Sequence, residues 1–331
     1  LLPVWPVQNG LISIFLRLFS KPLSKVTAQL LPGLVVPTFD LGQHTSPFLL
    51  LVHHHHTFLP FDPIRPISKL ILPEGFPAHP HRGFVTLTIV LKGGLVHRDS
   101  IGIKQRYGAN PKFHSSKNSQ WLMTGSGVLH EEMWDVESGS EQELYQIWVD
   151  VPQASKMNEP QVLVLGGDNE CPTIIEASGS TTKLVVGGFE DSNQVRASVT
   201  TLSQMTVACV SIDVGAVWTG KIPRSFGTIV VYVRSGRIEI NGDQVDAFQT
   251  AIVSASACAG EMEILALEKS TDVLILAGEP LNQPVVTGGS FVMTSERDIS
   301  IAKSDYQRGK FGIPFDHKLS DEAWAEHVKR Q

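Results

Sequence analysis

Cysteine is scarce in this chain of 331 residues, which contains only Cys171, Cys209 and Cys258. The three are far apart, odd in number and form no Cys-x-x-Cys pair, which argues against both a disulfide scaffold and a zinc ribbon. They are typical of a reduced compartment, where lone cysteines pack as small hydrophobic residues. The sequence therefore predicts a fold that depends on an ordinary hydrophobic core.

Basic charge is also in short supply, because 27 Lys and Arg stand against 33 Asp and Glu, giving a net charge of −6. This balance excludes the broadly basic surface that non-specific nucleic-acid binding requires. Hydrophobic residues make up 42% of the chain and charged residues 18%, which suffices for a buried core and argues against disorder. The 28 Gly and 20 Pro, beside only 4 Tyr and 6 Trp, favour short strands joined by turns.

The sequence has no apolar run long enough to cross a membrane. Its most apolar stretch, residues 11–34, is interrupted by Arg17, Lys21 and Pro22, well short of about 20 apolar residues. No acidic residue precedes Asp40, and a basic, acid-poor leader is typical of an organelle-targeting remnant. The alternative is an irregular tail followed by a first strand. We assign residues 1–44 to this N-terminal extension and first strand.

From residue 47 onward the pattern is that of short strands. Residues 84–91 are rich in β-branched side chains, and Lys92-Gly93-Gly94 has the form of a hairpin turn. Further strands are predicted at residues 47–52, 95–98, 120–124, 144–151, 183–187, 206–213, 227–233, 237–240 and 273–277. Helices are predicted only at the C-terminus, at residues 295–308 and after Ser320. Many strands in two similar halves predict an all-β protein with two tandem antiparallel barrels or sandwiches.

Histidine is the most informative residue type, since none of the 12 lies between Glu131 and Asp316. A histidine-built site would therefore belong to the first domain. Residues two apart in a strand point to the same face, so His79 and His81 can converge on one point, as can His130 and Glu132.

Three imidazoles and one carboxylate on facing strands would make a metal site. Such a nitrogen and oxygen set suits a first-row divalent ion, and Fe(II), Mn, Ni and Cu all fit, with Zn also compatible. The fourth residue after His130 is Trp134, so there is no HExxH motif and a zincin helix is excluded. The alternative is that both pairs are incidental to strand sequence.

Several segments resemble the signature of pirins, which are members of the cupin superfamily. The resemblance covers roughly residues 45–312, and its most specific element is His-Pro-His-Arg-Gly-Phe, at residues 79–84. Its other segments are residues 76–78, 120–121, 124–133, 146–149, 156–157, 276–280, 289–293 and 305–312. It implies a bicupin with a metal-binding N-terminal cupin domain at 45–155, a C-terminal cupin domain without a metal site at 156–312, and a helical tail at 313–331. By motif position the metal ligands are His79, His81, His130 and Glu132, whereas Glu131 faces the other way.

The resemblance implies two functions from different classes. The first is a quercetin 2,3-dioxygenase, in which a flavonol chelates the metal, usually iron, and O₂ opens the heterocycle. Our own hypothesis is that Glu132 would act there as the catalytic base as well as a ligand. The second is an iron-bearing, redox-sensing transcription cofactor in the nucleus or cytoplasm, which binds a regulator protein and not DNA. A cupin that stores a structural metal is a third reading. Of these we expect the dioxygenase.

Two segments depart from the common pirin pattern. Residues 98–120 are longer than usual, which weakens inference about the substrate. Residues 53–56 are four consecutive histidines, either an extra metal patch or, as we expect, a polar strand end. His97 is expected either beside the metal ligands or at the surface. Four further residues are expected either to line an apolar pocket near the metal or to belong to the plain core: Phe84, Trp121, Met123 and Met133.

Overall fold

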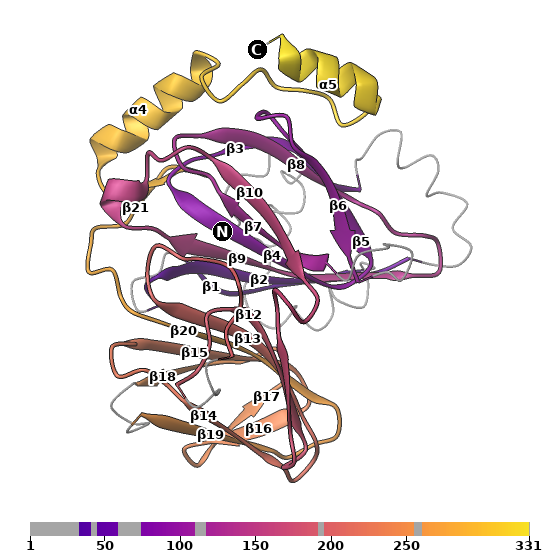
Figure 1. Cartoon of the computed structure of the whole chain (residues 1–331), viewed down its shortest axis with the longest axis vertical. Coiled ribbons are helices and arrows are strands. Elements are labelled where there is room, and N and C mark those ends of the chain that lie inside the picture. Colours follow the sequence, from indigo (N-terminus) through magenta and orange to yellow (C-terminus); the bar gives the residue numbers. More distant parts are fainter. Residues whose placement is uncertain are drawn as a thin grey trace, which may run out of the picture.

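The computed structural model describes residues 33–40, 45–58, 74–109, 117–190, 195–254 and 260–330. These residues form two β-barrels stacked one on the other, with two helices beside the first barrel (Figure 1). The predicted all-β class, with two tandem cupin-type barrels and short C-terminal helices, is confirmed. Most of the predicted targeting remnant lies outside the described residues, and strand β1 (Gly33–Asp40) is the described part of residues 1–44.

The first barrel consists of a six-stranded and a four-stranded antiparallel sheet. The six-stranded sheet has the order β1-β2-β9-β4-β7-β10, with β2 (Phe48–Thr57), β9 (Glu141–Asp150), β4 (Phe84–Lys92), β7 (Lys117–Met123) and β10 (Gln161–Gly166). The four-stranded sheet has the order β3-β8-β5-β6, with β3 (Gly75–His81), β8 (Val128–Trp134), β5 (Gly94–Asp99) and β6 (Lys104–Gly108). The strands predicted in this half are confirmed as β2, β4, β5, β7 and β9.

The second barrel repeats this plan. Its six-stranded sheet has the order β11-β12-β13-β20-β15-β18, with β11 (Thr173–Glu176), β12 (Ser180–Val186), β13 (Met205–Ile212), β20 (Thr271–Gly278), β15 (Thr228–Ser235) and β18 (Thr250–Ser254). Its four-stranded sheet has the order β14-β19-β16-β17, with β14 (Val217–Lys221), β19 (Glu261–Ala266), β16 (Arg237–Ile240) and β17 (Asp243–Asp246). Asn241 and Gly242, between β16 and β17, have φ of 53° and 85°, the conformation that a two-residue hairpin turn of the Asn-Gly type requires.

The two six-stranded sheets pack face to face and bury one continuous apolar cluster between the barrels. Leu51 and Ile147 contribute from the first sheet, and Val230 and Leu276 contribute from the second. Both faces of each six-stranded sheet are therefore covered, one by its own barrel interior and the other by the neighbouring sheet. This explains why their strands read as nearly unbroken hydrophobic runs rather than as alternating ones.

The interiors of the two barrels differ in chemistry. The second barrel is filled by a single apolar cluster that includes Trp218, Val231 and Ile275. In the first barrel, apolar side chains form smaller clusters, such as the one around Leu95 and Leu144. The inward-facing polar side chains that separate these clusters are buried His81, Thr88, His97, Asp99, Gln120, His130 and Glu132. A chemical site therefore belongs to the first barrel.

Segments from late in the sequence return to the first barrel. Strand β10 lies within the range predicted for the second domain, yet it pairs with β7 of the first sheet. A short hairpin of β21 (Val286–Thr287) and β22 (Val292–Met293) also returns, since Val292 N donates to the Arg82 carbonyl at 3.0 Å. By sheet pairing, the first barrel therefore extends beyond residue 155.

Two helices complete this covering layer, α4 (Glu296–Gln307) and α5 (Asp321–Lys329), which lie on the side of β3 and β8 (Figure 1). Each begins at a serine whose hydroxyl caps a backbone N–H of the first turn, Ser295 for α4 and Ser320 for α5. Both helices were predicted from the sequence and are confirmed.

Arg98 attaches the C-terminal tail to the outer face of the four-stranded sheet. Its guanidinium donates to the Glu131 carboxylate at 2.5 Å and to the carbonyls of Leu319 and His317 at 2.8 and 3.0 Å. It also lies 5.8 Å from the centre of the Trp324 ring. Because Glu131 is 0% exposed, this carboxylate depends on Arg98 for its charge compensation.

We expect Arg98→Ala to lower the free energy of unfolding by about 3–5 kcal/mol, because it leaves the buried Glu131 carboxylate without a cation. Urea unfolding followed by circular dichroism measures this change. The matched control is Arg237→Ala, which removes an exposed pair with Asp246 and should leave the free energy of unfolding nearly unchanged. Equal effects of the two substitutions would contradict the prediction.

Candidate metal centre

Strands β3 and β8 place three histidines on one inner face. The antiparallel register sets His79 directly opposite His130 and His81 opposite Val128. Alternation along β3 then keeps His79 and His81 on the same side of the sheet. A bulge between Phe76 and His79 shifts the register just before the first histidine. The convergence predicted from residue spacing is therefore realised by direct cross-strand pairing.

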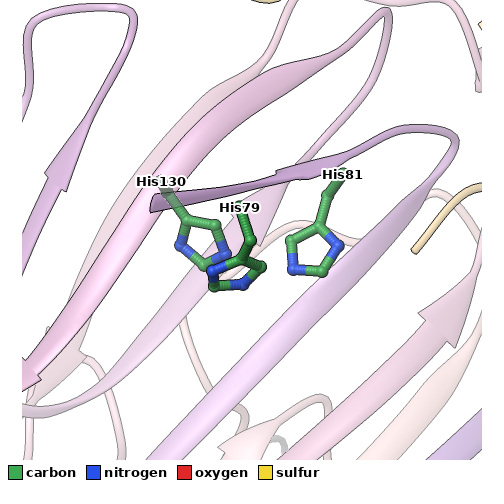
Figure 2. A group of neighbouring side chains, drawn as sticks. All are labelled: His79, His81 and His130. Carbon is green, nitrogen blue, oxygen red and sulfur yellow. The ribbon is translucent and has the colours of Figure 1, made fainter. Parts of the chain in front are cut away.

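The three imidazoles form a compact group in which each ring approaches the other two (Figure 2). Ring centroids lie 4.7 Å apart for His79 and His81, 4.4 Å for His79 and His130, and 4.9 Å for His81 and His130. One ring nitrogen from each residue lies within 4.8 Å of the other two. We call this group the histidine triad. Its spacing allows all three imidazoles to bind one metal ion.

Backbone carbonyls orient two of the three rings. His79 Nδ1 donates to the Pro77 carbonyl at 2.8 Å, and His81 Nδ1 donates to the Ser290 carbonyl at 3.3 Å. With the proton on Nδ1, the lone pair is on Nε2, the form in which an imidazole binds a metal. Ser290 precedes β22, so the returning C-terminal segment helps to orient a candidate ligand.

Burial keeps the triad in its neutral form. Removal from water lowers the pKa of all three histidines, most strongly for His81 and His130, and the neighbouring imidazoles lower the pKa of those two further. Both ring nitrogens of His130 are buried and have no hydrogen-bond partner among the described residues. Buried polar atoms without partners are rare in folded proteins. The triad therefore fits a divalent transition metal.

Glu132 is the next inward-facing residue after His130 on β8, and three side chains donate hydrogen bonds to its carboxylate. Thr88 and Tyr107 donate to Oε1 at 3.0 and 3.1 Å, and Gln146 donates to Oε2 at 2.9 Å. The carboxylate is buried but is not among the donors that lie within 4.8 Å of one another. Its role as the fourth ligand therefore stays a prediction. Its inward direction is fixed, because it shares a face with His97, its partner on β5.

His97 and Asp99 form a second buried pair beside the triad. His97 Nε2 and Asp99 Oδ2 are 2.9 Å apart, and both residues are 0% exposed. The His97 ring lies 5.4 Å from that of His130, and its Nδ1 has no hydrogen-bond partner among the described residues. Of its two expected positions, His97 takes the one beside the metal ligands. Asp99 was not predicted as a site residue, although its spacing from His97 repeats that of His79 and His81.

The other candidates fall on different sides of the sheets. Phe84 contacts His81, with ring centroids 5.1 Å apart, and so lies next to the triad. Trp121 and Met123 face the neighbouring barrel and belong to the apolar cluster between the barrels, as plain core. Met133 is half-buried and shares the outward side of β8 with Glu131.

The four consecutive histidines divide between the two faces of β2. His53 lies between the barrels, where its ring nitrogens are 2.8 Å from Tyr232 Oη and 3.0 Å from Glu143 Oε1. His55 pairs with Glu141 at 2.9 Å on the same side. His54 and His56 face the interior of the first barrel. Among the described residues no group of three metal-binding side chains includes them, so the run is not a second metal cluster.

The long segment of residues 98–120 includes the end of β5, the turn of the β5–β6 hairpin and β6. Asp99 Oδ1 accepts from the backbone N–H groups of Ile101 and Ile103 at 3.0 and 2.8 Å, which fixes the turn between the two strands. Residues 110–116 lie outside the described residues. The site therefore receives both His97 and Tyr107 from this hairpin.

Comparison with known proteins gives the family. The model of the family described as Pirin matches residues 33–149, and that described as Pirin C-terminal cupin domain matches residues 207–312. This chain belongs to the pirin family. The rat protein named pirin is 34% identical over 248 residues, which cover 73% of this chain and 79% of the rat protein.

Other pirin relatives carry an enzyme name. A Pseudomonas aeruginosa protein provisionally named quercetin 2,3-dioxygenase is 33% identical over 276 residues, which cover 82% of this chain and 88% of the relative. A crystal structure titled quercetin 2,3-dioxygenase from Acinetobacter baumannii superposes with a TM-score of 0.73 at 30% identity. That match covers 85% of this chain and 92% of the other. None of the helices in the described part of this pirin is both long and apolar enough to span a membrane.

We expect His79→Ala, His81→Ala and His130→Ala each to lose stoichiometric metal, because each removes one of three converging imidazoles. Metal content after anaerobic reconstitution with Fe(II) is measured by plasma mass spectrometry, on protein purified without nickel affinity. The matched control is His55→Ala, which should retain full metal content. His55 lies on the face of β2 that points away from the interior of the first barrel. Full occupancy in any triad variant would contradict the assignment of that residue.

Acidification is expected to destabilise the metal-free protein. The unfolded histidines titrate near pH 6.5, whereas the folded triad has lowered pKa values, so below pH 6.5 the unfolded chain binds more protons. The free energy of unfolding should therefore fall from pH 7 to pH 5, by up to about 1.4 kcal/mol per histidine and pH unit. Urea unfolding of His81→Leu/His130→Leu should show a flatter pH dependence than that of the wild type. The control His327→Leu, on α5 and outside the triad, should keep the pH dependence of the wild type. Parallel pH profiles for all three proteins would refute this account.

Proposed function

We propose that this pirin is a metal-dependent dioxygenase of the quercetin 2,3-dioxygenase type, acting on a flavonol or a similar planar hydroxy-ketone. The observation that carries the proposal is the histidine triad, three converging imidazoles inside the first barrel, of which His81 and His130 are buried. The relatives that bear the enzyme name support it. Fe(II) is the ion we expect at the triad, and Mn, Ni, Cu and Zn suit the same ligands.

A bound divalent ion would polarise the hydroxy-ketone oxygens of the substrate and bring O₂ next to them. The protein supplies the acid–base chemistry, and Glu132 is the base that we assign. Its Oε2, which accepts from Gln146, takes the proton of the substrate hydroxyl group, while Thr88 and Tyr107 hold Oε1. Fixing one oxygen orients the other, so the proton acceptor keeps a constant position.

The family also supports a regulatory role, in which a pirin binds a transcription regulator. No contact of this chain distinguishes that role, and a nuclear or cytoplasmic location stays a prediction with it. The two functions differ in one requirement, because turnover needs an acid–base group beside the metal and a redox switch does not. The buried Glu132 and its three donors therefore favour the enzyme.

Consumption of quercetin by the Fe(II)-loaded protein, followed by absorbance in air, tests the proposal. We expect turnover in the wild type, none in His81→Ala, and a loss of about 10²- to 10⁴-fold in Glu132→Gln, which cannot accept the proton. His55→Ala serves as the control and should keep wild-type activity. Full activity in Glu132→Gln would exclude its role as base. Stoichiometric metal in the wild type without turnover of any flavonol would overturn the dioxygenase and favour the regulator-binding role.

A further inference from the structure

Five ring-bearing side chains form a box inside the first barrel, next to the triad. They are Phe58, Phe76, Trp134, His54 and His56, and we call them the aromatic box. His54 lies edge-on to Phe76 at 5.3 Å, and His56 lies 4.7 Å from Phe58 and 5.4 Å from Trp134. Phe58 and Phe76 in turn meet Trp134 edge-on at 5.9 and 6.3 Å. The rings of β2, β3 and β8, together with that of Phe58 just after β2, therefore form one contiguous group.

Strand geometry places the box directly beyond Glu132. His130, Glu132 and Trp134 alternate along the same face of β8, and Phe76 on β3 pairs with Glu132. Four residues along a strand span about 13 Å, so Trp134 lies about that far from His130. The distance is comparable to the length of a planar molecule with two or three fused or linked rings.

The box combines buried and accessible rings. Phe58 and Phe76 are 6% and 5% exposed, whereas His54, His56 and Trp134 remain half-buried although they face inward. These three inward-facing side chains therefore keep solvent-accessible surface that a ligand can cover. Trp134 also packs against an apolar cluster that contains Leu95, its cross-strand partner on β5, and Leu144, both of which are fully buried.

Two polar groups of the box lack protein partners. The Trp134 Nε1–H is buried and makes no hydrogen bond with the described residues. The ring of His54 likewise makes no hydrogen bond within the described part of the chain. Burial, together with His53 and His56, lowers the pKa of His54 to about 4, so its imidazole is neutral and offers one donor and one acceptor. A neutral imidazole among aromatic rings suits a phenolic hydroxyl better than an anion.

We propose that the aromatic box binds the remote ring of a planar chelating substrate, and that His54 selects for a phenolic hydroxyl on that ring. The substrate's hydroxy-ketone edge then faces the triad, and its remote ring packs against the accessible surfaces of Trp134, His54 and His56. The inference rests on the proposed function, since it takes the triad as the point to which the other end of the substrate binds. It adds selectivity between flavonols with different remote rings, which the triad alone does not provide.

Three flavonols that differ only in the remote ring test the choice: quercetin with two hydroxyls, kaempferol with one, and galangin with none. Their dissociation constants are measured without O₂ by fluorescence quenching of the Fe(II)-loaded protein. We expect wild type to bind kaempferol and quercetin about three- to tenfold more tightly than galangin, the contribution of one hydrogen bond. His54→Phe should bind all three with the affinity of galangin, because it keeps a ring and removes the nitrogens.

Three further variants distinguish the effect of the His54 hydrogen bond from general effects on binding. His54→Gln, which restores a hydrogen-bonding group, should recover part of the preference, and the control His55→Phe should keep all of it. Trp134→Leu should weaken all three flavonols alike, since it removes stacking surface. Thermal unfolding checks that each variant is folded.

Equal binding of the three flavonols by wild type, or an unchanged preference in His54→Phe, would overturn the inference. So would the absence of binding by any of them. If the proposed function is wrong but the inference is right, the result differs. The protein then binds hydroxylated flavonols more tightly than galangin in a way that depends on His54, but it consumes no flavonol in air. The two conclusions are thus decided by separate measurements.

Discussion

The alternation of side chains along β8 and β5 is the constraint on which both the candidate site and the C-terminal tail depend. On one face these strands present His130, Glu132 and His97, and on the other they present Glu131 and Arg98. A slip of one residue would exchange the two sets. Arg98 holds the tail on the outer face through the carbonyls of Leu319 and His317. Its ion pair with Glu131, its partner on β8, favours the register that faces the histidines inward.

The stacking of the two barrels explains how one of them can hold so many buried polar groups. Each buried polar side chain costs free energy unless it is hydrogen-bonded, and His130 has no partner among the described residues. The second barrel carries less of this cost, because one large apolar cluster fills most of its described interior and the buried Thr182 hydroxyl there accepts from Trp218 Nε1 at 2.8 Å. The cluster between the six-stranded sheets adds further burial. The stability of the second barrel and of the interface thereby offsets the polar interior of the first.

The sequence alone was sufficient to predict features that depend on residues close together in the chain. Spacing by two residues predicted that His79 and His81 share a face, and cap and turn residues predicted both C-terminal helices. It was insufficient where pairing between distant strands decides, as for His97, whose position beside His130 depends on the β5–β8 register. Alternation also could not tell which side Trp121 faces, because β7 is covered on both faces and hydrophobicity is the same on each.

Glu132 connects the site to both sheets of the first barrel, so its substitution affects more than proton transfer. Its donors come from β4, β6 and β9, whereas the residue itself is on β8. Glutamine at this position keeps one carbonyl oxygen but places an NH₂ group against the donors of Thr88 and Tyr107 or against that of Gln146. A loss of activity alone would therefore combine a missing base with a disturbed contact between sheets. Unchanged metal content and unfolding free energy in that variant would assign the loss to proton transfer.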